Sequence, residues 1–233
     1  ASAINAAIAA NGMVEFPAAV GSSLAYYGLS SRINVTRSNV HLRFQNGAVL
    51  LPFANAGSMI EINGAPPATW VALSANAWQN ACVITTATDP GWQVGDWLEI
   101  RADTVIASTP NYFGDSVGDC HKITQKLGSG PFQWVFDEPL CDDFLTSANA
   151  VAGKATMLEN IVIENPQFNT PDFASIINFS IRAQYCAGLK IIRPKAFGSK
   201  LAFGPDNPTG DFIKIINCVN PYIEDPCMTH GAY

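Results

Sequence analysis

The feature that most constrains the fold is a short apolar pattern that recurs along the chain. In the segment "ENIVIEN" (159–165), two aliphatic residues are separated by one other residue, and 187–193 and 211–217 repeat this arrangement. The pattern also occurs upstream, and its members are Val40 with Leu42, Ile60 with Ile62, Ile161 with Ile163, Leu189 with Ile191, and Ile213 with Ile215. Neighbouring pairs start at similar intervals, except across one long stretch between the second pair and the third.

These spacings suit one coil of a β-solenoid, because a single coil cannot bury its apolar face and must stack on its neighbours. We therefore expect Ile161, Leu189 and Ile213 to occupy equivalent positions, one above another, in a single wall. Other short alternating runs, such as "NVHLRF" (39–44) and "DWLEIRA" (96–102), are separated by Gly, Asn, Ser and Pro. Such runs are typical of an all-β protein.

A second repeat lies four residues after these core positions. Asn165, Arg193 and Asn217 stand there in the last three segments. Asparagines at a solenoid bend can hydrogen-bond to the coils above and below, so the sequence predicts a partial ladder that Arg193 interrupts. Ordinary turn asparagines are the alternative interpretation.

The chain begins with the signals of a short helix and then of a strand. Ile4 and Ile8 lie one turn apart among alanines, and Asn11-Gly12 tolerates the left-handed conformation that ends a helix. Residues 13–16 then alternate in period two before a proline. A helix this short is unstable alone. We therefore expect residues 1–12 to cover something apolar.

The long interval indicates an insertion. Ile62 and Ile161 are 99 residues apart, whereas a coil should use about 20 to 30, so roughly 70 to 80 residues are extra. Within it, "GSGP" (128–131) predicts a hairpin turn, and 104–120 resembles an exposed loop or edge. The sequence thus predicts the first coils at 13–74, an antiparallel subdomain at 75–156, and further coils at 157–233 that continue beyond the given chain.

Composition excludes several classes of function. The net charge is −6 and the pI about 4.9, without a basic patch, which argues against a nucleic-acid partner. No apolar run approaches the roughly 20 residues needed to span a bilayer, so we expect no membrane insertion. The six cysteines show no zinc-ligand spacing, and no phosphate loop or cofactor motif is present. Buried free thiols are the expected state of Cys186 and Cys218, with disulfides as the alternative.

Two stretches carry a resemblance to a known family. "AINAAIAANGMVEFPA" followed by "SSRINVTRSNVHLRFQNGAVL" resembles the start of the pectate-lyase-like, right-handed parallel β-helix domains of phage tailspikes and related polysaccharide-active proteins. "GWQVGDWLEI", "WVFDEPLCDDF" and "ATMLENIVIENPQF" are similar to the small β-subdomain that many tailspike solenoids carry between early coils. The resemblance implies an all-β right-handed parallel β-helix with an N-terminal capping helix and an inserted antiparallel subdomain. The usual Gly-x-Tyr after the proline is replaced here by "AAVGSSLAYYG".

The same resemblance implies a function. It suggests a bacteriophage tail spike or tail fibre that recognises a bacterial surface polysaccharide and, if it is active as an enzyme, depolymerises it as a lyase or glycoside hydrolase. The implied partners are that polysaccharide, two further copies in a homotrimer, and other virion tail proteins, and the implied location is the virion tail. A free extracellular lyase, hydrolase or epimerase on the same scaffold is one alternative, and a non-catalytic structural virion component is another.

Candidate site residues are few. Glu224, Asp225 and His230 lie close together in sequence and are the candidate catalytic groups. Sugar binding needs exposed aromatic and carboxylate side chains, and the candidates are Tyr112, Phe113, Asp206 and Asp211. Tyr26 and Tyr27 form a second aromatic pair, and His41 and His121 are expected to face outward, with no partner that the sequence identifies.

Overall fold

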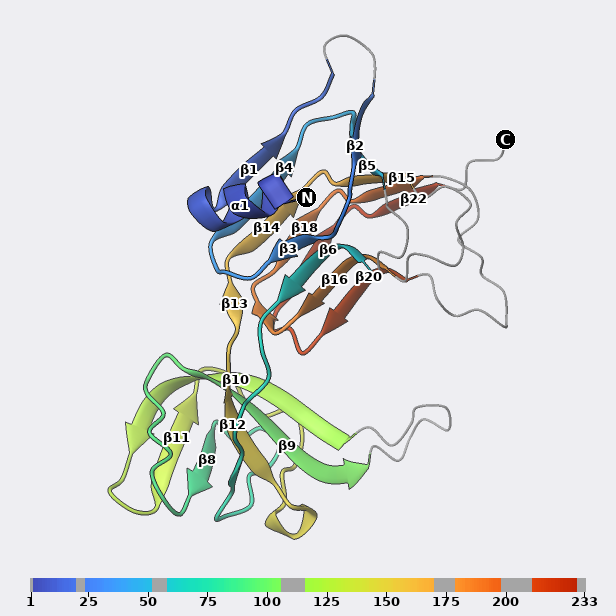
Figure 1. Cartoon of the computed structure of the whole chain (residues 1–233). Helices are drawn as coiled ribbons and strands as arrows, with labels where there is room; N and C mark the ends of the chain where they lie inside the picture. Colours follow the sequence, from blue (N-terminus) through green and yellow to red (C-terminus); the bar gives the residue numbers. More distant parts are fainter. Residues whose placement is uncertain are drawn as a thin grey trace. The chain divides into compact units, whose positions relative to one another are not determined.

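The computed structural model describes residues 2–19, 24–51, 58–105, 116–169, 179–197 and 211–229 (Figure 1). The chain divides into two compact units: unit 1 comprises residues 1–64 and 158–233, and unit 2 comprises residues 65–157. Each unit has a hydrophobic core of its own. The described residues are mostly β-strand, with one α-helix and one short 3₁₀ helix, so the all-β prediction is confirmed at this level.

Among the described residues, unit 1 forms three parallel sheets of four or five strands and one two-stranded parallel sheet. Sheet A consists of β1 (Met13–Phe16), β4 (Val40–Phe44), β14 (Ile161–Glu164), β18 (Lys190–Ile192) and β21 (Tyr222–Glu224). Sheet B consists of β2 (Ala25–Gly28), β5 (Ala48–Leu51), β15 (Gln167–Asn169), β19 (Lys195–Phe197) and β22 (Cys227–Thr229). Sheet C consists of β3 (Ile33–Val35), β6 (Ser58–Asn63), β16 (Phe179–Gln184) and β20 (Asp211–Ile216). The two-stranded sheet consists of β13 (Leu158–Glu159) and β17 (Cys186–Ala187), which precede β14 and β18 of sheet A along the chain.

The chain passes through the three sheets in a fixed order. It adds one strand to A, then B, then C, and repeats this sequence from β4, from β14 and from β18. Ile163 pairs with Ile191 and Ile191 with Ile223, so each of these pairings spans one full passage of the chain. Leu42 pairs with Ile163, and without the residues of unit 2 the stretch between them is as long as the passage from Ile163 to Ile191. Unit 2 is therefore inserted into one passage without changing its length.

The interior is built from rows of aliphatic side chains. Leu42, Ile163 and Ile191 are adjacent in sheet A and all fully buried, because alternate residues of a strand point to the same face. The predicted equivalence of Ile161 and Leu189 is confirmed, since the residues that follow them pair with each other.

The prediction for Ile213 is wrong. Ile213 pairs with Ile181 in sheet C, and the residue that follows Ile191 in its row of sheet A is Ile223. The strands of all three sheets share one apolar alternation, so a spacing taken from the sequence can join strands of different sheets. The two shorter steps of the repeat both run from sheet A to sheet C, whereas the step from Ile161 to Leu189 is a full passage.

The helix α1 (Ser2–Asn11) packs against β1 and β3 at one end of these sheets (Figure 1). Ile8 is only 2% exposed and belongs to the core of unit 1, with Ile4 packed against that core. Asn5 fixes the helix to the sheet edge, because its Oδ1 accepts the backbone N–H of Asn34 at 2.9 Å. The helix thus covers apolar surface.

Left-handed residues mark the corners between sheets. Asn39 and Asn160 have φ of 60° and 56° just before sheet A, and Asn160 Nδ2 donates to Asn39 Oδ1 at 3.0 Å. After sheet A, Asn165 and Arg193 have φ of 54° and 49°, and Arg193 Nε donates to Asn165 Oδ1 at 2.8 Å. Asparagine tolerates this conformation better than most residues, which explains its recurrence here.

Asn165 and Arg193 occupy the same corner after sheet A, as predicted, but Arg193 continues the ladder through its hydrogen bond to Asn165 and does not interrupt it. The placement of Asn217 in this row is wrong. Asn217 lies at the corner after sheet C, where its Nδ2 donates to Tyr185 Oη at 2.9 Å. The ladder that joins two asparagine side chains is the one between Asn39 and Asn160, which sequence spacing did not reveal because the insertion separates them.

Unit 2 is a closed antiparallel sheet. Its strands are β7 (Val71–Ala72), β8 (Val83–Thr86), β9 (Trp97–Val105), β10 (Ser116–Leu127), β11 (Phe132–Phe136) and β12 (Val151–Ala155). Their order in the sheet is β7-β12-β9-β10-β11-β8. A bridge between Leu73 and Thr86 joins the two end strands. The predicted hairpin at 128–131 connects β10 and β11, and the 3₁₀ helix (Thr146–Ala148) precedes β12.

The core of unit 2 combines aliphatic residues with the buried aromatic residues Trp92, Trp134, Phe136 and Phe144. Trp134 is fully buried, contacts Trp92 edge-on at 5.1 Å between ring centroids, and donates its indole N–H to Thr86 Oγ1 at 3.0 Å.

The sequence placed the start of the insertion at residue 75, whereas β7 pairs with β12 and residues 65–74 group with unit 2. A two-residue strand shows no alternation that could reveal it. Part of the predicted loop 104–120 is strand, since β9 extends to Val105 and β10 begins at Ser116.

Candidate functional site

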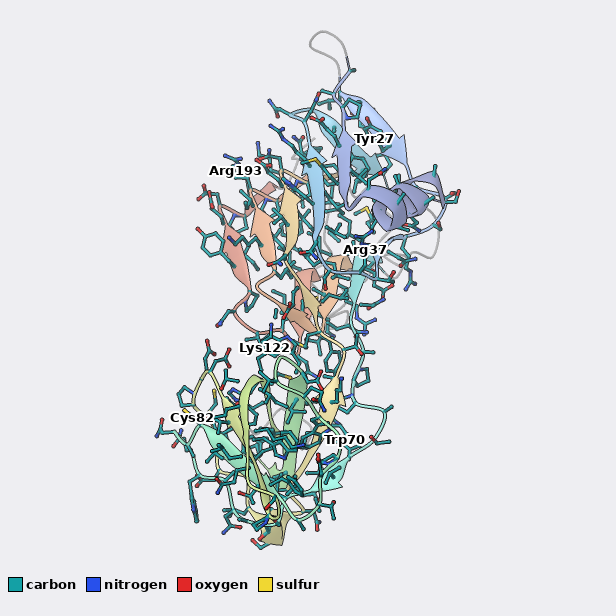
Figure 2. The ribbon with its side chains drawn as sticks, turned by 90° about the vertical axis from the view of Figure 1, so that its left-hand side faces the viewer. Tyr27, Arg37, Trp70, Cys82, Lys122 and Arg193 are labelled. Carbon is teal, nitrogen blue, oxygen red and sulfur yellow. The ribbon has the colours of Figure 1, made fainter. Side chains whose placement is uncertain are left out.

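The outer face of sheet A carries a group of charged side chains that contact one another. Because Leu42, Ile163 and Ile191 point into the core, the alternate positions point outward, and they include His41, Arg43, Glu164, Lys190, Tyr222 and Glu224. Parallel register brings these residues together from strands that are far apart in the chain. Figure 2 shows Arg193, at the corner that follows β18, outside the ribbon of these strands.

Glu164 is the centre of this face. Its Oε1 lies 3.2 Å from Arg193 Nη2, and its Oε2 lies 3.3 Å from His41 Nε2 and 3.7 Å from Arg43 Nε. We call Glu164 with these three partners the Glu164 cluster. The Glu164 side chain is 23% exposed, whereas those of Arg43 and Arg193 are 54% and 48% exposed. Glu164 therefore lies between two guanidinium groups, one on β4 and one just after β18, and each of them is about half exposed.

His41 faces outward, as predicted, and it has a partner that the sequence does not identify. Its partner, Glu164, is distant in sequence and reaches it because β4 and β14 are neighbours in sheet A. The insertion hides this proximity, so only knowledge of the strand register could have revealed it.

Glu224 and Tyr222 lie on β21, two strands from β14. Tyr222 donates its hydroxyl to Glu224 Oε2 at 3.3 Å, and 51% of Tyr222 is exposed. The negative charge of Glu224 and this hydrogen bond raise the pKa of Tyr222 above its ordinary value, so the phenol stays protonated at neutral pH. Register places Ile192 between Glu164 and Glu224, so their Cα atoms are roughly 9.6 Å apart at the usual strand spacing.

The other predicted site residues divide into two groups. Asp225 follows Glu224 at a corner, with a φ of 46°, and Asp211 is the first residue of β20. Tyr112, Phe113, Asp206 and His230 lie outside the described residues. The structure thus brings Glu224 and Asp225 close to the Glu164 cluster.

Tyr26 and Tyr27, the second aromatic pair, lie in different surroundings: Tyr26 faces solvent, whereas Tyr27 contacts other residues of unit 1. Tyr26 is 54% exposed on β2. Tyr27 donates its hydroxyl to the carbonyl oxygen of Pro17 at 2.6 Å and contacts Phe16 edge-on, and burial raises the pKa of Tyr27. Tyr27 therefore fixes the chain near β1, and Tyr26 is the member of the pair that remains available for contacts.

Sheet C carries a different ionic group. Glu61 is 4% exposed on β6, forms an ion pair with Arg32, and accepts a hydrogen bond from Arg182 Nη1 at 3.1 Å. Arg182 also donates to Gln184 Oε1 at 3.1 Å. These contacts join three neighbouring strand positions, so we interpret the group as structural.

Unit 2 has exposed aromatic residues and a buried acid–histidine pair. Trp70 lies over the guanidinium of Arg101 at 4.6 Å, and Trp78 is 56% exposed. His121 is 3% exposed, stacks on Phe136, and lies with its Nε2 2.7 Å from Asp119 Oδ2. The prediction that His121 faces outward alone is therefore wrong, because β10 turns this position toward the interior of the closed sheet.

Among the described residues, no three His, Cys, Asp or Glu side chains gather as metal ligands would. Within the same part of the chain, no helix has the length and apolar character needed to cross a bilayer.

The fold and this outer face define a class of protein in which each passage of the chain adds one strand to each of three parallel sheets. An antiparallel unit is inserted into one passage, and one sheet has a charged outer face. Comparison with known proteins makes the class more specific. Residues 69–156, which lie within unit 2, match the family model described as "K1 capsule-specific polysaccharide lyase, Rider domain". A curated relative, "Depolymerase, capsule K1-specific" of Klebsiella phage K64-1, is 25% identical over 198 residues, which is 84% of this chain and 22% of the relative.

Solved structures show the same fold. The tailspike protein gp49 of Pseudomonas phage LKA1 matches with a TM-score of 0.61 at 15% identity, over all of this chain and 41% of its own. The tailspike gp61 of Pseudomonas phage phi297 gives 0.62 at 12%, over all of this chain and 42% of its own. The Gp54 tailspike of Acinetobacter baumannii bacteriophage AP22, solved with a capsular saccharide, gives 0.50 at 16%, over 94% and 42%.

Together these comparisons support a protein of the phage tailspike type, as the sequence resemblance predicted. The chain spans about a fifth of the length of the curated relative and about two fifths of the solved chains.

Proposed function

We propose that this chain is part of a phage tailspike that binds, and cleaves, an acidic capsular polysaccharide of a bacterium. The observation that carries the proposal is the Glu164 cluster, in which two guanidinium groups face outward on a wall of parallel strands. Arginine binds carboxylates through paired hydrogen bonds, so such a pair suits a uronate-containing polymer. The similarity to a capsule-specific depolymerase supports a capsule as the polymer.

The proposal includes the finer fold. Unit 1 is a segment of a right-handed parallel β-helix, with sheets A, B and C as its walls and α1 as its cap. The fixed order of the sheets and the parallel register of their strands support this architecture. A β-helix presents a long flat wall, which suits an extended polymer better than a small molecule.

The chemistry that this face suits best is elimination. A lyase needs a cation beside the uronate carboxylate, a base that removes the adjacent proton, and an acid that protonates the leaving oxygen. Arg43 and Arg193 would bind the carboxylate, and His41, whose side chain on β4 is 32% exposed, would accept the proton. Tyr222, which is exposed on the same face, would supply the acid. The similarity of unit 2 to a domain of a polysaccharide lyase favours this chemistry.

Hydrolysis is the second candidate. The separation of Glu164 and Glu224, roughly 9.6 Å between Cα atoms, is near the range of about 6.5 to 9.5 Å between carboxyl groups in inverting glycosidases. In this chemistry Glu164, on β14, would be the base and Glu224, on β21, the acid. Asp225 and Asp211, together with Tyr112, Phe113, Asp206 and His230, remain predicted contributors to catalysis or sugar binding.

The assembly belongs to the proposal as well. We expect a homotrimer attached to other tail proteins of the virion, in line with the tailspike resemblance. A free extracellular enzyme on the same scaffold would instead behave as a monomer, and a purely structural virion component would bind no sugar. Sedimentation of the full-length protein distinguishes the first two cases, and binding to capsule distinguishes the third.

The test is to incubate the full-length protein with purified capsular polysaccharide and to follow binding, chain length and the absorbance of unsaturated products. Arg43→Gln removes one charge-assisted contact worth about 1.5 to 3 kcal/mol, so we expect affinity to fall roughly 10- to 150-fold. Lys195→Ala removes a cation from the outer face of sheet B and is the matched control. Its affinity should stay unchanged.

Each outcome bears on one part of the proposal. Shortened chains with unsaturated ends support elimination, and shortened chains without them support hydrolysis. Binding without shortening removes the enzymatic part and leaves recognition. Equal affinity of the wild-type protein and the Arg43→Gln variant, with an unchanged melting temperature, would refute the placement of the site on sheet A.

A further inference from the structure

Two cysteines lie on neighbouring passages of unit 1. Cys186 belongs to β17, and Cys218 stands one passage later, just as Ile223 stands one passage after Ile191. The backbone fixes the cysteines side by side: the N–H of Val219 donates to the carbonyl oxygen of Cys186 at 2.8 Å, and the N–H of Gly188 donates to that of Val219 at 2.9 Å. A bridge between Ala187 and Val219 confirms the parallel register. Cα atoms in such register are about 4.8 Å apart.

The two side chains have the same orientation. Each thiol lies 3.4 Å from the carbonyl oxygen two residues before it, that of Gln184 for Cys186 and that of Ile216 for Cys218. Both side chains pack in the core of unit 1. A disulfide requires Cα atoms about 4.4 to 6.8 Å apart and Cβ atoms on the same side, so both conditions are met. The remaining change is a rotation of the two thiols toward each other.

We propose that Cys186 and Cys218 are a disulfide-forming pair that links two successive passages of unit 1 when the protein meets an oxidising environment. Both cysteines are free thiols in the structure. A tailspike leaves the reducing cytosol when virions are released, so the environment required for oxidation is one that such a protein meets. The proposal does not depend on the sugar-binding function.

The two thiols differ in accessibility, which fixes the order of the steps. Cys186 is fully buried, whereas Cys218 is partly exposed. The hydrogen bond from the Cys186 thiol lowers the pKa of Cys218 despite its burial, and the same contact together with burial raises the pKa of Cys186. Cys218 is therefore the thiol that reacts first with an external disulfide.

The oxidant we name is a low-molecular-weight disulfide such as oxidised glutathione. The Cys218 thiolate attacks one of its sulfur atoms and releases one glutathione thiolate, which gives a mixed disulfide. The Cys186 thiolate then attacks the Sγ of Cys218 and releases the second glutathione thiolate, and the two protons lost by the cysteines end on the two glutathione molecules. The cysteine pair loses two electrons, and the oxidised glutathione gains them.

The experiment treats the folded full chain with oxidised glutathione, blocks remaining thiols in denaturant, and maps tryptic peptides by mass spectrometry. We expect the peptide 183–190 to be linked to the peptide that begins at residue 215, through Cys218. That peptide also contains Cys227, so fragmentation or a Cys227→Ser variant identifies the linked residue. Reduction should release the peptides, and the oxidised protein should unfold at a higher temperature than the reduced protein.

Two variants test the order of the steps. Cys186→Ser should retain a glutathione adduct on Cys218, because the resolving thiol is missing. Cys218→Ser should leave Cys186 unmodified, because Cys186 is buried. The proposal is overturned if Cys186 stays alkylatable in oxidised wild-type protein, if it links to another cysteine, or if both cysteines carry glutathione at the end of the reaction.

Discussion

The separate cores of the two units lead to a prediction about Ile191. Ile191 is fully buried in the row that includes Leu42 and Ile163, and Ile191→Ala removes three carbon atoms from that row. At about 0.8 kcal/mol per buried carbon, the transfer contribution is about 2.4 kcal/mol. The cavity adds to it, so we expect the free energy of unfolding of unit 1 to fall by about 3 to 4 kcal/mol, within the usual range of about 2 to 5 kcal/mol.

Ile192→Ala is the matched control, because Ile192 is the next residue on the same strand and points outward. It is half-buried, so its truncation should cost less than about 1.5 kcal/mol. All five tryptophans lie in unit 2, at positions 70, 78, 92, 97 and 134. Denaturation followed by tryptophan fluorescence therefore monitors unit 2, while far-UV circular dichroism monitors both units.

Ile191→Ala should move a transition seen by circular dichroism and leave the tryptophan transition in place. Equal losses for Ile191→Ala and Ile192→Ala would refute the assignment of the inward face of sheet A. A tryptophan transition that moves as far as the circular dichroism transition would refute the independence of the two cores.

Two further predictions concern unit 2 and are read from its tryptophan fluorescence. Burial alone would raise the pKa of Asp119, but hydrogen bonds from His121 and from the backbone N–H groups of Cys141 and Cys120 outweigh it and hold the pKa below its ordinary value. The ionised carboxylate therefore stabilises the folded unit above the unfolded pKa of about 3.9, and this stabilisation is lost as pH falls through the folded pKa. Asp119→Asn should make the free energy of unfolding of unit 2 depend less on pH in acid. An unchanged dependence on pH would contradict these hydrogen bonds. A Cβ added at Gly153 would lie 2.5 Å from Pro67 Cβ and from the Thr69 carbonyl oxygen, so Gly153→Ala should lower the free energy of unfolding of unit 2 by about 1 to 3 kcal/mol. Gly118→Ala is the control, because the nearest atom to its added Cβ lies at 3.7 Å. Equal denaturation midpoints for the two variants would argue against the close approach at Gly153.

Local features of the fold could be predicted from the sequence. The alternation in 39–44 gave β4, the alanine-rich start gave α1, and the turn at 128–131 gave the hairpin between β10 and β11. Each of these depends on interactions between residues close in the chain. Ile213 shows the limit: its segment has the right pattern for a strand, but pattern alone does not specify which sheet the strand joins.

The candidate site shows a second limit. His41 and Arg43 meet Glu164 because β4 and β14 are neighbours in sheet A, although the whole of unit 2 lies between these strands in the sequence. No spacing rule connects residues at such a distance. His121 was misassigned for a different reason: its neighbours alternate as in an open sheet, whereas closure of the sheet through Leu73 and Thr86 encloses that face.

The junction between the units has a consequence for how such proteins diversify. The N–H of Gly64 donates to the carbonyl oxygen of Gln184, and the N–H of Leu158 donates to that of Tyr185, so the two ends of the interruption in unit 1 are anchored to consecutive residues of the next passage. Within unit 2, Ala65 and Thr156 exchange both backbone hydrogen bonds, which holds entrance and exit together. A segment whose two ends meet in this way behaves as an exchangeable cassette. Recombination can replace it with another of similar end geometry, and an evolving phage could then acquire a new accessory domain while the scaffold that carries it keeps its register.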